Sequence, residues 1–315
     1  LFQTLRQVVW RRGFRWRPVF NWREPGFREL ASKMPAAVYA TAIAQINIAV
    51  SLTLARWTGE GSVTYLTYSQ RLIQLPQALI AMALSTALLP QLSHVVQEGD
   101  RQSLRRLMSL SFRIIALIFV PASIGLIVLA RPIVEVILQR GGWDATATAN
   151  TARALIYYAI GLYALGMYRI LVPVYYAQKD MMTPVKIGAV AMVFNAALSL
   201  ILMQFLSYAG LALASSVSAT LNAYLLWRRV RYRLGADLAV RIWATLFKAL
   251  GASVVMGAVV GFGFYTTEKA WNPAGTLPLL GLITLWIAVG MVVYAGSARL
   301  IGLWDRESIR RVMGR

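Results

Sequence analysis

The chain has 315 residues, of which 58% are hydrophobic and only 14% are charged, and its formal net charge is +20. Its apolar runs repeatedly reach the roughly 20 residues that a bilayer crossing needs, which predicts an all-α polytopic membrane protein. With no cysteine and one histidine, disulfides, thiolate metal sites and histidine-cluster metal chemistry are excluded.

Residues 1–33 combine arginines with tryptophan and phenylalanine directly before the first apolar span. Such a mixture can stack on single-stranded nucleic acid, but in this position it is more typical of a cytoplasmic segment lying on anionic lipid. We therefore interpret it as an interfacial linker whose partners are membrane lipids and not nucleic acid. Because the chain begins at Leu1 without a signal-peptide pattern, we also interpret it as part of a longer protein.

Eight apolar segments follow, each long enough to cross a bilayer. They are Pro35–Trp57, Ser62–Leu92, Leu110–Ala130, Thr151–Ala177, Pro184–Leu206, Tyr208–Trp227, Ile242–Phe264 and Leu277–Ile301. Lysine and arginine are concentrated in alternate connecting loops and in the C-terminal tail. By the positive-inside rule, these basic segments and both ends of the chain are predicted to be cytoplasmic.

Three shorter features have a predicted structural role. Gln97–Leu107 is predicted to form a short amphipathic helix with Asp100 as its N-cap. Ala130–Trp143 is too short to cross again, so we expect an interfacial or partly re-entrant segment. Gly257 and Gly261 form a GxxxG pattern, which predicts the close approach of two membrane helices.

Arg71 is a full positive charge inside the second span. A rise of about 1.5 Å per residue places it about 14 Å after Ser62, near the middle of a hydrocarbon core about 30 Å thick. A cation costs from about 2.5 to well over 10 kcal/mol there, so Arg71 is expected to face a bundle interior or a watery cavity and to be functional. Pro76 predicts a bend in the same helix.

Other polar residues within spans leave alternatives open. Arg169, in the fourth span, could line the same cavity or reach the cytoplasmic surface. A polar run in the sixth span either packs helices by hydrogen bonding, which we favour, or lines a path. The run consists of Ser215, Ser216, Ser218, Thr220 and Asn222.

The acidic residues argue against a membrane phosphotransferase or hydrolase, and we do not expect an enzyme. Twelve of them are scattered along the chain, and no pair lies at helical spacing within a span, where it could hold a divalent metal or act as acid and base. A Walker-type glycine loop is also missing from the sequence, so ATP is not the expected energy source and no cofactor is implied.

Four ordered sequence blocks resemble a known family. They are YSQRLIQLPQALIAMALSTALLPQLS, LARPIVEVILQRGGWD, YYAQKDMMTPVKI and GLALASSVSATLNAYLL. They resemble the lipid II flippases of the MurJ (MviN) type, in the multidrug/oligosaccharidyl-lipid/polysaccharide exporter superfamily. The resemblance implies fourteen helices in two six-helix lobes plus two extra helices. This chain would hold the linker (1–33), the second lobe (34–233), and the extra pair with a basic tail (234–315), without the N-terminal lobe.

The resemblance also implies a function and a site. Such proteins move an undecaprenyl-pyrophosphate-linked peptidoglycan precursor from the inner to the outer leaflet of the bacterial inner membrane by alternating access. Arg71 aligns with the cavity arginine that would bind the pyrophosphate, and a planar guanidinium suits bidentate phosphate binding. Arg169 is a second, weaker candidate for substrate binding.

Some members of the family hold a sodium ion through carboxylates and an asparagine. The matching positions here are Ser51, Asn195 and Ser199, with Ser215 nearby. Their oxygens are neutral and bind a cation more weakly than carboxylates do, so we expect a weak remnant of the site and no tight metal binding.

Two other interpretations stay open. The chain could export another lipid-linked oligosaccharide or a cationic drug, although a cation exporter should line its cavity with acidic residues. It could instead be a non-transporting membrane scaffold that recruits cell-wall enzymes. A scaffold would have no reason to keep a mid-membrane arginine.

Overall fold

The computed structural model describes residues 25–87, 91, 95–96, 98–234, 237–271 and 275–303, and within them it contains helices and no strand, which confirms the predicted fold class. The helices are α2 (Pro25–Trp57), α3 (Ser62–Ala87), α5 (Arg101–Val128), α6 (Ala130–Leu138), α7 (Ala145–Ile160), α8 (Leu162–Ala177), α9 (Met182–Leu206), α10 (Tyr208–Leu234), α11 (Asp237–Trp271) and α12 (Thr276–Leu300). Most of the proposed linker, residues 1–24, and the tail, residues 304–315, lie outside the described residues. The remainder of the linker, from Pro25, belongs to α2.

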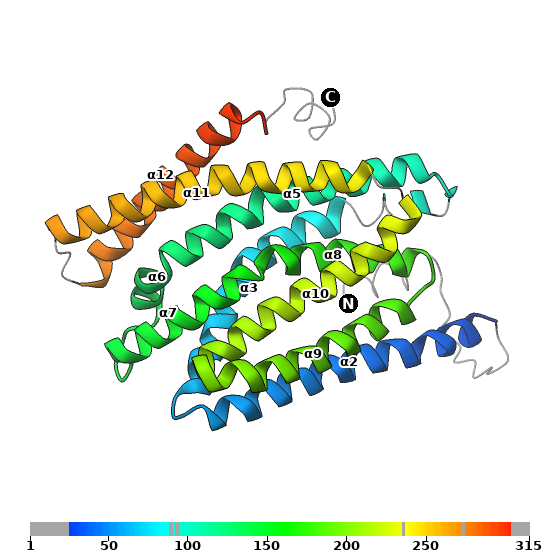
Figure 1. Ribbon diagram of the computed structural model, residues 1–315, viewed down its shortest axis with the longest axis horizontal. Coiled ribbons are helices and arrows are strands. Elements are labelled where there is room, and N and C mark those ends of the chain that lie inside the picture. The colour runs from blue at the N-terminus through cyan, green and yellow to red at the C-terminus, as the bar shows by residue number, and fades with distance from the viewer. Residues whose placement is uncertain are drawn as a thin grey trace, which may run out of the picture.

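The helices form one bundle, with α11 and α12 at one edge and α2 and α9 at the other (Figure 1). A larger cluster of buried apolar side chains, including Phe112, Leu155 and Leu226, joins α5 to α7 and α10. A smaller cluster, including Val120 and Met256, joins α5 to α11 and α12. Helix α5 therefore belongs to both cores and connects the extra helix pair to the rest of the bundle.

Among the described residues, six helices are long and apolar enough to cross a membrane, namely α2, α5 and α9 to α12, and the bent pair of α7 and α8 forms a seventh candidate. Helix α3, which contains Gln70, Arg71, Gln74 and Gln77, is not among the candidates found in the described residues, so its crossing stays a prediction. The segment after α5 forms α6, whose nine residues are too few to cross.

The fourth span was predicted as one helix, but it is broken at Gly161, where α7 and α8 meet at 46°. A Cβ at Gly161 would lie 2.8 Å from the Cα of Ser216 in α10, so the chains approach too closely for a larger residue. Ser216 donates to the carbonyl of Tyr157 at 2.7 Å, and Ser123 of α5 donates to that of Ala159. Neighbouring hydroxyls thus satisfy backbone groups that the break releases.

The close helix approach predicted from the GxxxG pattern of α11 is observed, and the partner helix is α5. A Cβ at Gly257 would lie 2.6 Å from the side chain of Ile124, and Gly261 faces the same helix. Arg113 of α5 also donates a hydrogen bond to the carbonyl of Leu303, just after α12. These contacts fix the extra pair against α5.

Asp100 is the N-cap of α5, as predicted, because its carboxylate accepts hydrogen bonds from the backbone N–H groups of Gln102 at 2.9 Å and Ser103 at 3.1 Å. The prediction of a separate short helix ending at Leu107 was wrong. No glycine or proline follows the cap until Pro121, so the helix continues directly into the membrane-spanning segment.

Candidate functional site

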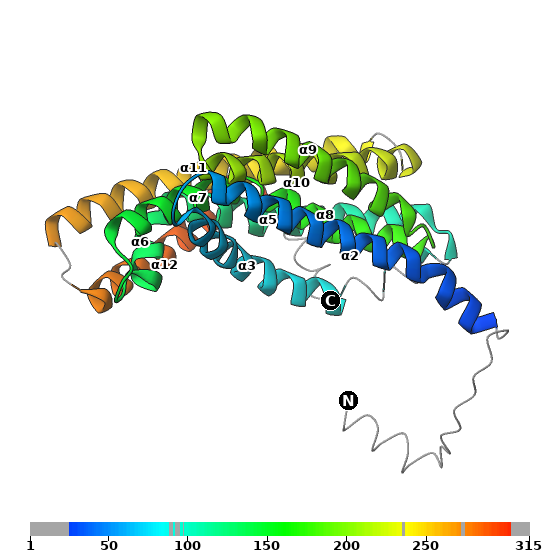
Figure 2. The same ribbon diagram turned by 90° about the horizontal axis from the view of Figure 1, so that it is seen from below.

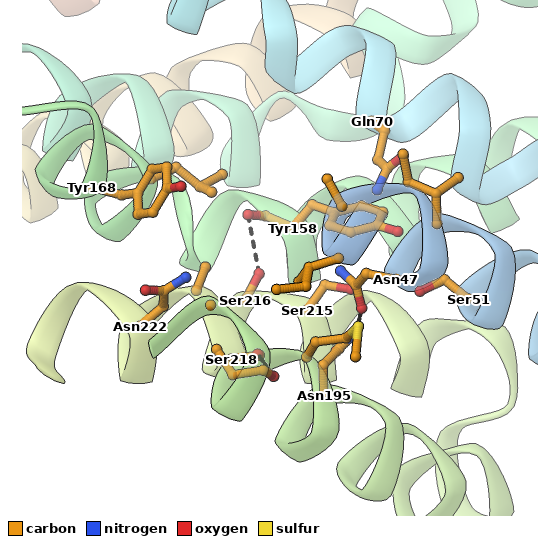
Figure 3. Close-up of a pocket in the computed structure, with 18 of the residues that line it drawn as sticks. Asn47, Ser51, Gln70, Tyr158, Tyr168, Asn195, Ser215, Ser216, Ser218 and Asn222 are labelled. Atoms are coloured by element: carbon orange, nitrogen blue, oxygen red, sulfur yellow. Dashed lines mark hydrogen bonds between the residues drawn. The ribbon is translucent and has the colours of Figure 1, made fainter. Parts of the chain in front are cut away.

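A cavity of about 500 Å³ lies among α2, α3, α7, α8, α9 and α10 (Figure 3). Its polar lining consists of Asn47, Ser51, Thr67, Gln70, Gln74, Gln77, Tyr158, Tyr168, Tyr176, Asn195, Ser215, Ser216, Ser218 and Asn222. None of the described lining residues is acidic or basic. The cavity can therefore attract a ligand through dipoles and hydrogen bonds, but it supplies no formal charge.

Two asparagines meet across the cavity. The Nδ2 of Asn195, in α9, donates to the Oδ1 of Asn47, in α2, at 2.9 Å (Figure 3). The Oδ1 of Asn195 and the Oδ1 of Asn222 are buried, and neither has a hydrogen-bond partner among the described residues. A buried acceptor without a partner is costly, so these two oxygens favour a hydrogen-bond donor or a cation in the cavity.

Three of the four positions proposed for a weak sodium site lie on this cavity: Ser51, Asn195 and Ser215. Ser199 is buried one turn further along α9 but does not line the cavity, and Ser215 donates to the carbonyl of Leu211 at 2.9 Å. Across the described residues there is no group of three acidic, histidine or cysteine side chains that could hold a metal ion. The oxygens that converge here are neutral.

The polar run of α10 serves both roles that the sequence left open. Ser218 donates to the carbonyl of Ala191 in α9 at 2.6 Å, and Ser216 donates to α7, so the hydroxyls join helices. Both serines and Asn222 also line the cavity.

The cavity residues of α3 were not recognised in the sequence. Gln70, Gln74 and Gln77 recur at the helical spacing of four and three residues, and all three line the cavity. That periodicity of glutamines within an apolar span was the available signal. Asn47 and Tyr158 carried no comparable pattern.

Arg71 does not line this cavity, and its side chain is exposed. Helix α3 runs along the lower face of the bundle in Figure 2, on the side opposite α9. The guanidinium carbon of Arg71 lies over the ring of Tyr68, 5.5 Å from its centroid. Arg71 thus presents a cation on the surface of the described bundle.

Arg169 is engaged by another side chain. Its Nη2 donates to the Oε1 of Gln77 at 2.9 Å, and Gln77 is buried at the edge of the cavity. The structure therefore brings Arg169 to the cavity wall, where it forms a hydrogen bond with Gln77 of α3.

These features define a multi-pass α-helical membrane protein with a neutral polar cavity inside its bundle and a separate cation on an outer face. The family model for "Lipid II flippase MurJ" matches residues 1–281. The chain belongs to this family, whose members are named as flippases, which are transporters and not enzymes.

Curated relatives agree with this assignment. A probable lipid II flippase MurJ of Haemophilus influenzae is 34% identical over 315 aligned residues, which cover 96% of this chain and 61% of the relative. One from Vibrio cholerae is 31% identical, with coverage of 91% and 54%, and a lipid II flippase MurJ of Burkholderia cenocepacia is 29% identical, with 90% and 55%. The chain thus spans between half and two thirds of the length of these relatives.

A solved structure shares the fold. "Lipid II flippase MurJ, inward closed conformation" superposes with a TM-score of 0.68 over 95% of this chain and 57% of that protein, at 23% identity. The likeness supports the helical architecture described above.

Proposed function

We propose that this chain is the second lobe and the extra helix pair of a lipid II flippase. In this proposal the full-length protein moves an undecaprenyl-pyrophosphate-linked peptidoglycan precursor from the inner to the outer leaflet by alternating access between two lobes. The membership of the chain in the MurJ family carries the proposal. Its coverage of 54% to 61% of three curated relatives agrees with a missing N-terminal lobe.

Arg71 is the residue that we assign to the pyrophosphate. It is exposed on α3, so a second lobe placed against this face would enclose the guanidinium between the lobes. In such a water-poor site a permanently charged, planar fork binds phosphate oxygens in pairs. Arg169 is the weaker candidate, since Gln77 already accepts one of its hydrogen bonds.

We further propose that the protein lies in the bacterial inner membrane with both ends of this chain in the cytoplasm. The support is the alternation of loop charge. The first turns of α5, which contain Arg105 and Arg106, and the end of α10 that contains Arg228 and Arg229 are basic, whereas the turn 58–61 has no lysine or arginine.

The alternative substrates differ in charge. A cationic drug would be stabilised by carboxylates, and the described lining of the cavity has none. Another lipid-linked oligosaccharide carries the same pyrophosphate as lipid II and would use Arg71 equally well. A scaffold without transport activity has no use for that cation.

Depletion of the full-length protein separates these alternatives. Cells that lose the protein should accumulate lipid II on the inner leaflet, measured by extraction and mass spectrometry of the lipid-linked precursors. Accumulation of a different lipid-linked glycan would identify another substrate. Unchanged precursor pools and unchanged outer-leaflet lipid II would contradict a transport function.

A further inference from the structure

Arg71 has a defined aromatic neighbour on its own helix. Tyr68 precedes it by one helical turn, and the guanidinium carbon lies 5.5 Å from the centroid of the Tyr68 ring. When a guanidinium stacks with its plane parallel to a ring, the ring contacts its face and the N–H edges stay available for other bonds. Those edges are the groups that make paired hydrogen bonds to a phosphate.

Tyr68 is in turn held by a residue from a different part of the chain. The ring of Trp143 meets that of Tyr68 edge-on, with centroids 5.1 Å apart and an interplanar angle of 79°. Such T-shaped pairs are favoured by the opposite charges of a ring's face and its edge. The three side chains therefore form a row in which Trp143 contacts Tyr68 and Tyr68 contacts Arg71.

Trp143 is itself fixed at the start of α7. Its backbone N–H donates to the carbonyl of Arg140 at 3.2 Å, and the next residue, Asp144, caps the helix by accepting from the N–H of Ala147 at 2.7 Å. The row thus begins in a short hydrogen-bonded turn that leads directly into the N-cap of α7. An arginine on a flexible stem gains from such support, because its ordering cost is met before the ligand arrives.

We propose that Tyr68, held by Trp143, is a positioning residue that orients the Arg71 guanidinium for the pyrophosphate of the lipid-linked substrate. The inference rests on the proposed function. It predicts that the aromatic ring, and not the Tyr68 hydroxyl, matters for binding the charged headgroup. Binding of the uncharged polyprenyl chain should not depend on Tyr68.

The test measures binding of undecaprenyl pyrophosphate and of uncharged undecaprenol to the purified full-length protein. Tyr68→Leu should weaken pyrophosphate binding about two- to fivefold, the amount expected for one cation–π contact, and leave undecaprenol binding unchanged. Tyr68→Phe should bind both ligands as the unmodified protein does. Trp143→Leu should reproduce the selective loss, since it frees the Tyr68 ring.

A matched control lies one turn earlier on α3. Tyr65 also makes an edge-on aromatic pair, with Tyr208 at 5.5 Å between centroids, but it has no contact with Arg71 in the described structure. Tyr65→Leu removes an equivalent aromatic contact and should leave the preference for pyrophosphate over undecaprenol unchanged. An equal loss of preference in Tyr65→Leu would contradict a specific role for Tyr68.

A double-substitution cycle with Arg71→Ala distinguishes the two proposals. If Tyr68 acts through the arginine, Tyr68→Leu should have no further effect on pyrophosphate binding once Arg71 is alanine. An equal effect in both backgrounds, or none in either, overturns the positioning role while leaving the Arg71 site intact. Unchanged pyrophosphate binding by Arg71→Ala itself overturns the substrate site and the positioning role together.

Discussion

Arg169 and Gln77 join α8 to α3 through a hydrogen bond of 2.9 Å, one residue after Pro76. Proline removes a backbone donor and weakens the helix at that point. Gln77 is only 7% exposed and lines the cavity, so the bond holds the cavity wall where α3 is weakest. This relationship gives Arg169 a structural role that the sequence did not indicate.

Gln77→Met should therefore destabilise the protein without removing the arginine. The substitution keeps the length of the side chain but loses the Oε1 acceptor, so we expect a loss of about 1 kcal/mol, seen as a lower midpoint of thermal unfolding. Gln74→Met, which changes a neighbouring glutamine of the same cavity, is the matched control. Equal midpoints for the two variants would show that the bond to Arg169 adds no stability.

Gly161→Ala should destabilise the break between α7 and α8. The added methyl group would lie 2.8 Å from the backbone of Ser216, which cannot move aside as a flexible side chain can, and overpacking of this kind costs about 1–3 kcal/mol. Gly188→Ala is the control, because no atom lies within 4 Å of a Cβ at this glycine in α9. Thermal unfolding that ranks Gly188→Ala below Gly161→Ala would contradict the close approach.

Features that depend on neighbouring residues could be predicted from the sequence, and features that depend on distant contacts could not. Asp100 was identifiable as a cap because capping involves the next few residues. The break at Gly161 was not, because it depends on hydroxyls from α5 and α10. Likewise, the bond between Asn47 and Asn195 joins residues 148 positions apart. Arg71 was recognised by its charge alone, whereas its contact with Tyr68 required the structure.

Single cysteines can test the proposed orientation, since the chain has no native cysteine. We expect Glu60→Cys to react with an impermeant thiol reagent in intact spheroplasts, and Gln102→Cys to react only after lysis. Both side chains are exposed, and Glu60 avoids the neighbouring Gly59, where the φ of 122° would strain a cysteine. If only position 102 were labelled in intact spheroplasts, the orientation of the chain in the membrane would be the reverse of the one proposed.

Transport by the full-length protein should vary little with sodium when the membrane potential is held constant. The oxygens that converge on the cavity are neutral. A charged carboxylate would interact with a sodium ion roughly twice as strongly as a neutral oxygen does. Ser51→Asp places a carboxylate on the cavity beside Asn195 and should make thermal stability rise with NaCl but not with KCl. A steep, saturable sodium dependence of the unmodified protein would contradict the prediction.

Arg71→Ala should abolish complementation of a depleted strain by the full-length gene while the protein remains in the membrane. Removal of a mid-membrane charge makes insertion easier, so a loss of function points to the cation itself. Arg71→Lys keeps the charge but loses the planar fork, and it should also be impaired if the pyrophosphate is bound in a bidentate manner.

Growth at single-copy, native-level expression, with membrane abundance measured by immunoblot, distinguishes the outcomes. Normal growth with Arg71→Ala would make the arginine structural, and full rescue by Arg71→Lys would show that a point charge is enough. If the alanine protein is absent from the membrane, binding of undecaprenyl pyrophosphate to protein purified from an overexpressing strain decides instead. There the Arg71 guanidinium, which lies over the Tyr68 ring, should be needed for binding.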